Sequence, residues 1–139
     1  MKLDIESKNL IKKLIYEAEE ALKVLKQYAK KGVKDLSDIY ALRYSIIQIV
    51  ESIALIASRI AETRGTVIEG YTEAMKFLAR TGIVKAETGE KLVKLARLRN
   101  LIVHRYWVIN DERILKEARE NGIEAIEEAI ENVRKLVEG

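Results

Sequence analysis

Two apolar stripes run side by side along residues 35–64, and they constrain the fold of this chain more than any other feature. Each stripe repeats at spacings of three and four residues, which is the period of an α-helix. The first stripe comprises Ile39, Leu42, Ile46, Ile49, Ile53, Ile56 and Ile60. The second comprises Ile47, Val50, Ala54, Ala57 and Ala61. Because more than a third of its circumference is apolar, such a helix must be covered on two sides. We expect the chain's own core to cover one side and a second copy of the chain to cover the small-residue side.

Similar spacing predicts the other helices. They are expected at residues 7–31, 71–80, from about 87 through the following motif, and 110–138, the last with a break at Asn121 and Gly122. Gly32 is a candidate C-cap and Asn110 a candidate N-cap. The chain contains no proline and no strand-like alternation. We therefore expect an all-α fold, a bundle of four main helices plus a short one, forming one domain over residues 1–139.

The amino-acid composition limits the kinds of metal or cofactor site that the chain can form, and it indicates where in the cell the protein is expected. The chain has no cysteine and one histidine, so it lacks the ligands for a zinc or di-iron centre, and we expect no metal and no cofactor. The formal net charge of +3 permits binding to RNA, phosphates or acidic partners without requiring it. The longest uninterrupted apolar run, residues 53–57, is too short to span a bilayer, and the N-terminus has no signal-peptide pattern. We expect a cytoplasmic protein with no membrane partner.

The only histidine lies in residues 99–106, RNLIVHRY, where functional groups are concentrated. On a helical wheel, Arg99 and Tyr106 are seven residues apart and nearly superposed, and Asn100 neighbours His104. Arg99 and His104 lie about 140° apart, so within one chain they would flank a site without touching. Two copies related by a two-fold axis would bring two such sets into one cleft.

These residue types suit cleavage of an RNA phosphodiester. Histidine gives and takes protons near neutrality, so His104 can deprotonate the ribose 2′-hydroxyl or protonate the leaving oxygen. Arginine stays charged and holds phosphate with a planar fork, so Arg99 can stabilise the transition state. The alternative is that His104 is structural and satisfied by a backbone carbonyl or a helix cap, as a lone histidine near a helix end often is.

Two charged residues border the stripes of the 35–64 helix. Arg43 and Glu51 are eight residues apart and lie on nearby faces. One interpretation makes them accessory residues that line the site. The other makes them an ordinary surface ion pair that contributes well under about 1 kcal/mol.

The spacing Arg99-x4-His104-x-Tyr106, with polar Asn100 after the arginine, resembles the signature of HepT toxins in the HEPN superfamily. The order of helices is similar to the family's along nearly the whole chain. The resemblance implies a dimeric helical bundle whose two motifs line a shared cleft, and a metal-independent ribonuclease that acts as a toxin. By the same resemblance Arg99 and His104 are catalytic, and Asn100 supports them.

The resemblance also implies a partner. The cognate antitoxin of the family is a nucleotidyltransferase of the MntA type, which attaches AMP to the motif tyrosine, here Tyr106. Some HEPN proteins have lost activity. Two alternatives therefore stay open: a non-catalytic subunit that binds a nucleotidyltransferase or a nucleotide, and a plain structural helical dimer.

Overall fold

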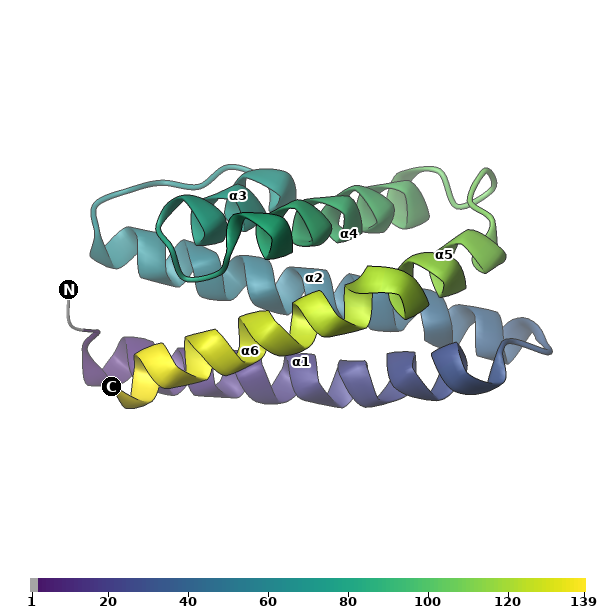
Figure 1. The fold of residues 1–139 in the computed structure, drawn as a ribbon, viewed down its shortest axis with the longest axis horizontal. Coiled ribbons are helices and arrows are strands. Elements are labelled where there is room, and N and C mark those ends of the chain that lie inside the picture. Colours follow the sequence, from purple (N-terminus) through teal and green to yellow (C-terminus); the bar gives the residue numbers. More distant parts are fainter. Residues whose placement is uncertain (1–2) are drawn as a thin grey trace.

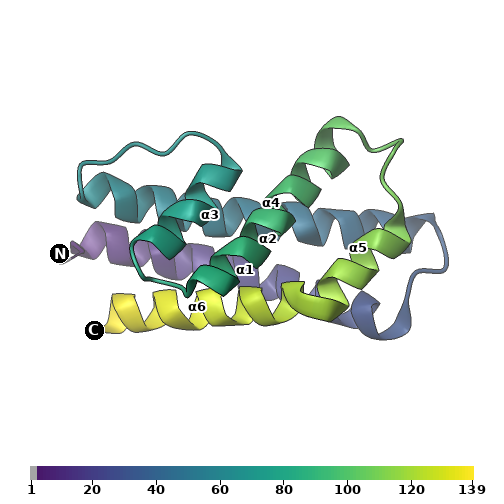
Figure 2. The same cartoon turned by 45° about the horizontal axis from the view of Figure 1, so that its top comes forward.

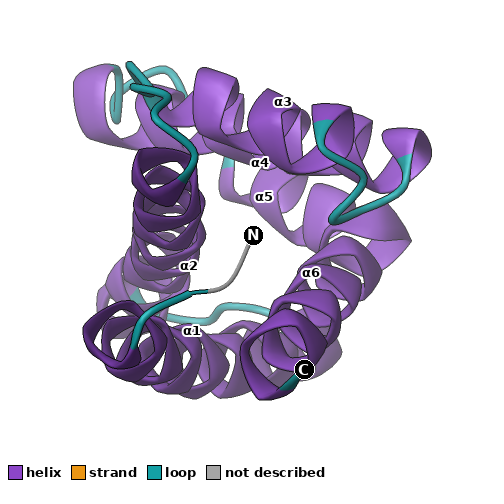
Figure 3. Cartoon of the chain, turned by 90° about the vertical axis from the view of Figure 1, so that its left-hand side faces the viewer, coloured by secondary structure: helices purple, strands orange, loops and turns teal. Residues whose placement is uncertain are grey.

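The computed structural model describes residues 3–139, and this part of the chain is all helical, as the sequence predicted. Figure 1 shows long helices lying along one axis, with α1 and α6 side by side, and α3 and α4 crossing above α2. The view along that axis in Figure 3 places α1, α2 and α6 around one side of the core and α3, α4 and α5 on the other. The elements are α1 (Ile5–Lys31), α2 (Leu36–Thr63), α3 (Tyr71–Arg80), α4 (Ala86–His104), α5 (Asp111–Glu117), a π-helical turn η1 (Ala118–Gly122) and α6 (Ile123–Glu138).

The helical hairpin of α1 and α2 is defined by its caps. The Asp4 carboxylate accepts a hydrogen bond from the Ser7 backbone N–H at 2.7 Å, so α1 begins two residues before the predicted Ser7. At the other end Gly32 adopts φ 77° and donates its N–H to the Tyr28 carbonyl at 2.7 Å, which confirms the predicted C-cap. Asp35 then caps α2 through the N–H of Asp38.

The second stripe of α2 is buried within the chain itself. Four of its five members, Val50, Ala54, Ala57 and Ala61, are at most 8% exposed, and the fifth, Ile47, is partly buried against the core. The helices α1, α3 and α4 all contact α2, so the small side chains let helices of the same bundle approach closely. The expectation that a second copy must cover this stripe is therefore wrong.

By length and composition alone, α2 could cross a membrane, although its longest uninterrupted apolar run, residues 53–57, is too short to do so. The helix is long enough and apolar enough to span a bilayer, but half of its most apolar stretch of 18 residues is buried inside the fold. A core helix of a globular bundle has the same properties, because it must be apolar on most of its circumference. The feature is weak evidence for a membrane span.

Close packing joins α3 to α4. Gly89 of α4 lies against Ala79 of α3, and a Cβ built on Gly89 would come within 2.5 Å of the Ala79 Cβ. At the start of α4 the Thr88 hydroxyl donates to the Glu128 carboxylate on α6 at 2.6 Å. This hydrogen bond, assisted by the nearby Lys85 ammonium, holds the pKa of Glu128 below its usual value. These contacts fix α4 against two neighbouring helices.

Gly89→Ala is expected to destabilise the fold. The Ala79 Cβ is attached to a helix backbone and cannot rotate away, so overpacking costs about 1–3 kcal/mol. The midpoint of that range, about 2 kcal/mol, exceeds the roughly 1 kcal/mol gained from helix propensity. Urea unfolding followed by circular dichroism measures the difference, with the exposed neighbour Glu90→Ala as control, expected within about 0.5 kcal/mol of the wild type. Equal or higher stability of Gly89→Ala would contradict the packing described.

The final helical segment is interrupted at the predicted position, because a π-helical turn that includes Asn121 and Gly122 separates α5 from α6. Asn110 caps α5 as expected, its side-chain oxygen accepting from the Glu112 N–H at 2.8 Å. At residues 118–122 the backbone passes through a π-helical turn before α6. A Cβ on Gly122 would lie 3.2 Å from the Leu95 side chain on α4, so the absence of a side chain lets α4 pack closely here. Figure 2 shows that α4 is inclined across the bundle and that a loop connects the C-terminal end of α4 to α5.

Candidate functional site

The motif lies at the C-terminal end of α4, and the helix stops in the middle of it. His104 is the last residue of α4. Arg105 leaves the helical conformation at φ −139° and ψ 46°, and its N–H donates to the Leu101 carbonyl. Residues 105–110 form a turn in which Ile109 is buried. The expectation that Tyr106 continues the helix above Arg99 is therefore wrong, because the chain turns here to insert Ile109 into the core and start α5.

Arg99 is held by three neighbours and is not on a solvated face. Its side chain is only 11% exposed. Nη2 donates to the Glu51 carboxylate at 2.9 Å, and Nη1 donates to the Asn100 side-chain oxygen at 3.0 Å. The guanidinium lies over the Tyr71 ring, 4.1 Å from the ring centroid. The ion pair and the cation–π contact both favour the charged, planar group in one orientation.

Tyr71 is the member of this site that sequence reasoning missed. It is the first residue of α3 and is separated from Arg99 by most of α3 and α4. No fixed spacing links the two residues, because the contact depends on how α3 packs against α4. The only signal in the sequence is an aromatic residue at a helix start that follows a loop.

Arg43 and Glu51 do not pair with each other. Glu51 binds Arg99, while Arg43 Nε donates to an Asp111 carboxylate oxygen at 2.8 Å. A second Arg43 nitrogen donates to the backbone carbonyl of Tyr106 at 3.3 Å. The surface pair considered from the sequence is thus absent from the described part of the chain. Each of the two residues instead contacts the motif or the turn after it.

The turn that follows α4 is fixed at both ends. Arg43 and Asp111 have side chains only 17% and 19% exposed, so their ion pair is shielded from solvent. Because Arg43 also binds the Tyr106 carbonyl, one guanidinium connects α2 to the turn and to the start of α5. Local sequence indicates only that a carboxylate such as Asp111 in the first turn of a helix suits the helix dipole, and the ion pair with Arg43 could not be read from it.

His104 and Tyr106 are exposed. Within residues 3–139 the His104 side chain makes no hydrogen bond, so the structural alternative of a capped or carbonyl-bound histidine receives no support. Tyr106 and Trp107 are 61% and 68% exposed, and their rings meet edge to face with centroids 5.2 Å apart. Most of the Tyr106 side chain is therefore exposed to solvent.

The arrangement provides two different chemical groups at one helix end. Arg99 is a fixed cation, and its Nε is buried with no hydrogen-bond partner among the described residues. His104 is a free imidazole five residues further along α4. No hydrogen bond joins the two side chains in residues 3–139. The described residues also contain no group of three or more His, Cys, Asp or Glu side chains that could hold a metal ion.

Comparison with known proteins gives consistent matches. A family model described as "Ribonuclease HepT-like" matches residues 15–133. A protein of Archaeoglobus fulgidus named "Putative RNase" is 26% identical over 107 residues, covering 73% of this chain and 81% of the relative. A crystal structure of a toxin–antitoxin with AMP-PNP has a TM-score of 0.80 at 18% identity, covering 91% of this chain and 98% of the other. A tri-AMPylated Shewanella oneidensis HEPN toxin in complex with MNT antitoxin has a TM-score of 0.68 at 18% identity, with coverage of 94% and 96%.

Proposed function

Because this chain belongs to the HepT-like ribonuclease family, we propose that it is a metal-independent endoribonuclease, the toxin of a toxin–antitoxin pair. The observation that carries the proposal is the combination of a fixed Arg99 with an exposed His104 at the end of one helix. The alternative is a non-catalytic subunit that binds a nucleotidyltransferase or a nucleotide. We expect the protein to act in the cytoplasm, where such a substrate is present.

The reaction follows from the two groups. The ribose 2′-oxygen attacks the adjacent phosphorus, forming a P–O bond while the bond to the leaving 5′-oxygen breaks. His104 takes the 2′-hydroxyl proton or gives a proton to the leaving oxygen. Arg99 stabilises the negative charge that develops on the phosphoryl oxygens. Glu51, Asn100 and Tyr71 are positioning residues, because they orient the guanidinium through direct contacts.

A homodimer would complete the site. Arg99 and His104 point about 140° apart on α4, so one chain does not direct both at the same phosphate. A second copy related by a two-fold axis can supply the other proton-transfer group. Exposed apolar side chains next to the motif provide contact area: Val103, Tyr106, Trp107 and Val108. Sedimentation at micromolar concentration is expected to give the mass of a dimer, and a monomer would contradict the proposal.

The test of activity is cleavage of a labelled single-stranded RNA by the purified protein in the presence of EDTA. The proposal predicts products that end in a 2′,3′-cyclic phosphate, because the attacking group is the 2′-oxygen. Activity that is lost with EDTA and restored by a divalent cation would overturn the metal-independent mechanism. Absence of cleavage together with stable binding to a nucleotidyltransferase would favour the non-catalytic alternative.

The proposed partner is a nucleotidyltransferase antitoxin that attaches AMP to Tyr106. The solved relatives that include an antitoxin, one of them with a tri-AMPylated toxin, support this class of partner. Tyr106 is well exposed and lies two residues after His104. An AMP group there would bring a phosphodiester and a negative charge to the end of α4 and repel RNA phosphate. Because Tyr106 lies in the turn, the adduct would stand beside His104 and not above Arg99.

Tyr106→Phe is expected to remain folded, to retain at least part of the cleavage activity, and to escape silencing by the antitoxin. The substitution removes only the exposed hydroxyl, and Arg43 still binds the backbone carbonyl at this position. Mass spectrometry after co-expression with the antitoxin should show AMP on the wild type and none on the variant. Tyr16→Phe, an exposed tyrosine on α1, is the matched control and should be silenced normally. AMP on another residue alone would reject this mechanism.

A further inference from the structure

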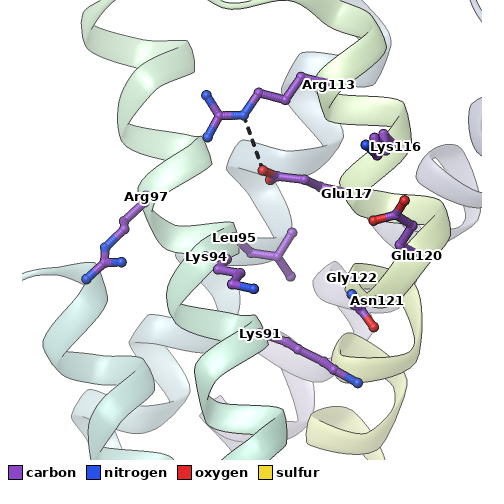
Figure 4. A pocket seen from close by; sticks show the side chains of 10 residues that line it. All are labelled: Lys91, Lys94, Leu95, Arg97, Arg113, Lys116, Glu117, Glu120, Asn121 and Gly122. Atoms are coloured by element: carbon purple, nitrogen blue, oxygen red, sulfur yellow. Dashed lines mark hydrogen bonds and ion pairs between the residues drawn. The ribbon is translucent and has the colours of Figure 1, made fainter.

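A hollow of about 490 Å³ lies between α4 and the segment formed by α5 and η1 (Figure 4). Three basic residues of α4 and two of α5 line it: Lys91, Lys94, Arg97, Arg113 and Lys116. Leu95 is the only large apolar side chain in the lining. We call this region the basic groove. It is separate from the contacts of Arg99, which face α2 and α3.

The lining of the basic groove has an excess of positive charge. Its five basic residues are accompanied by two acidic ones, Glu117 and Glu120, so the lining carries a net charge of +3. The complete chain, with 25 basic and 22 acidic residues, also has a formal net charge of +3. The remainder of the chain therefore has equal numbers of basic and acidic residues, whereas the groove lining has three more basic than acidic ones.

Three of the five cations are free to bind an external anion. Arg113 pairs with Glu117 at 3.2 Å and Lys91 with Glu87 at 3.5 Å. Lys94, Arg97 and Lys116 are exposed and have no carboxylate within 4.0 Å in residues 3–139. Unpaired cations that converge on one hollow raise the local positive potential and attract polyanions.

Two basic residues of the groove lie on the face of α4 that carries His104 at its C-terminal end. Arg97 precedes His104 by seven residues, so the two share a face of α4 about 10 Å apart along the helix. Lys94 and Arg97 also line a second hollow of about 460 Å³ between α3 and α4, together with Lys76. These two residues thus form a basic ridge between two hollows that leads to His104.

We propose that the basic groove binds the phosphate backbone of single-stranded RNA next to the cleavage point. This inference rests on the proposed ribonuclease function. The lining has seven charged side chains and one large apolar one, Leu95, whereas charged residues are depleted at the core of a protein interface and a typical cofactor pocket has few of them. Its cations are spread over two turns of α4 and over α5, as contacts to successive phosphates require.

The experiment measures RNA affinity apart from catalysis. A fluorescein-labelled single-stranded RNA of 20 nucleotides is titrated against a His104→Ala background, which prevents cleavage, at several salt concentrations. Adding Lys94→Glu and Arg97→Glu should weaken binding by about tenfold or more and reduce the salt slope by roughly 1.4, about 0.7 for each lost phosphate contact. The matched control, Lys13→Glu with Lys30→Glu on the exposed face of α1, makes the same change in net charge and should weaken binding by less than about threefold.

The outcomes separate this inference from the proposed function. If the control loses as much RNA affinity as the groove variant, or if the groove variant loses none, the proposal that the groove binds RNA is wrong. Unchanged RNA affinity with loss of the antitoxin complex would also overturn it and assign the surface to an acidic protein. With His104 restored, the groove variant should show a raised KM on long RNA, whereas the control pair on α1, Lys13→Glu with Lys30→Glu, should keep the KM of the wild type. If the wild-type protein binds RNA tightly through the groove but cleaves no RNA, the proposed RNA-binding role of the groove is kept and the proposed ribonuclease activity is rejected.

Discussion

His104→Ala is expected to lower the rate of RNA cleavage by about 10²–10⁴-fold, the usual contribution of a general acid or base. The imidazole is the only group of its kind in the chain, so no neighbouring histidine can replace it. Its side chain is exposed and makes no hydrogen bond in residues 3–139, so the loss should not be caused by unfolding. Single-turnover cleavage of labelled RNA and thermal unfolding of the same sample give the two measurements.

The neighbouring residue provides a control for His104. Arg105→Ala removes an exposed side chain that forms no ion pair within the described residues, one position along the same backbone. It should retain cleavage within a few-fold of the wild type and the same unfolding temperature. If His104→Ala cleaved RNA at the wild-type rate, the acid–base role would be wrong. A large drop in unfolding temperature for His104→Ala alone would instead identify a structural role.

Arg99→Lys is expected to reduce cleavage by about 10²–10³-fold although it keeps the positive charge. The guanidinium donates hydrogen bonds to Glu51 and Asn100 at the same time and lies over the Tyr71 ring. An ammonium group is a point charge without a planar fork, so it cannot keep all three contacts and also face a phosphate. KM should change less than kcat, because the interaction strengthens in the transition state.

The control for Arg99 is another arginine that bridges two helices. Arg134 on α6 binds Glu19 on α1, far from the motif, so Arg134→Lys tests the general cost of replacing an interhelical arginine. It should leave cleavage unchanged. Comparable losses of activity in both variants would mean that Arg99 acts through stability. Wild-type activity of Arg99→Lys would show that charge alone suffices and that the positioning contacts are not needed.

The helices themselves could be predicted from local sequence. The bounds of α3 match the prediction at both ends, and the caps Gly32 and Asn110 were identified correctly. These features depend on side-chain period and on residues that satisfy nearby backbone groups, both of which can be read within a short window.

The end of α4 could not be predicted, because tertiary contacts determine it. No glycine or proline occurs in residues 105–110, so nothing local indicates that the helix stops at His104. The stop depends on the burial of Ile109 and on the contacts that Arg43 makes from α2. The same limit explains the error about the second stripe of α2, since the sequence shows that a face needs cover but not which helix supplies it.

The double attachment of Arg43 has a thermodynamic consequence for recognition of the turn. Fixing the backbone of a residue removes conformational freedom worth about 1–2 kcal/mol. In this chain part of that entropy is already lost in the free protein, because Arg43 holds the Tyr106 carbonyl and Asp111 together. Under the proposed function, a nucleotidyltransferase that modifies Tyr106 would therefore meet a segment that Arg43 already holds in place, and it would not need to order that segment itself. Binding to a preorganised segment is tighter for the same contacts, so Arg43 would contribute to the affinity for the proposed antitoxin without touching it.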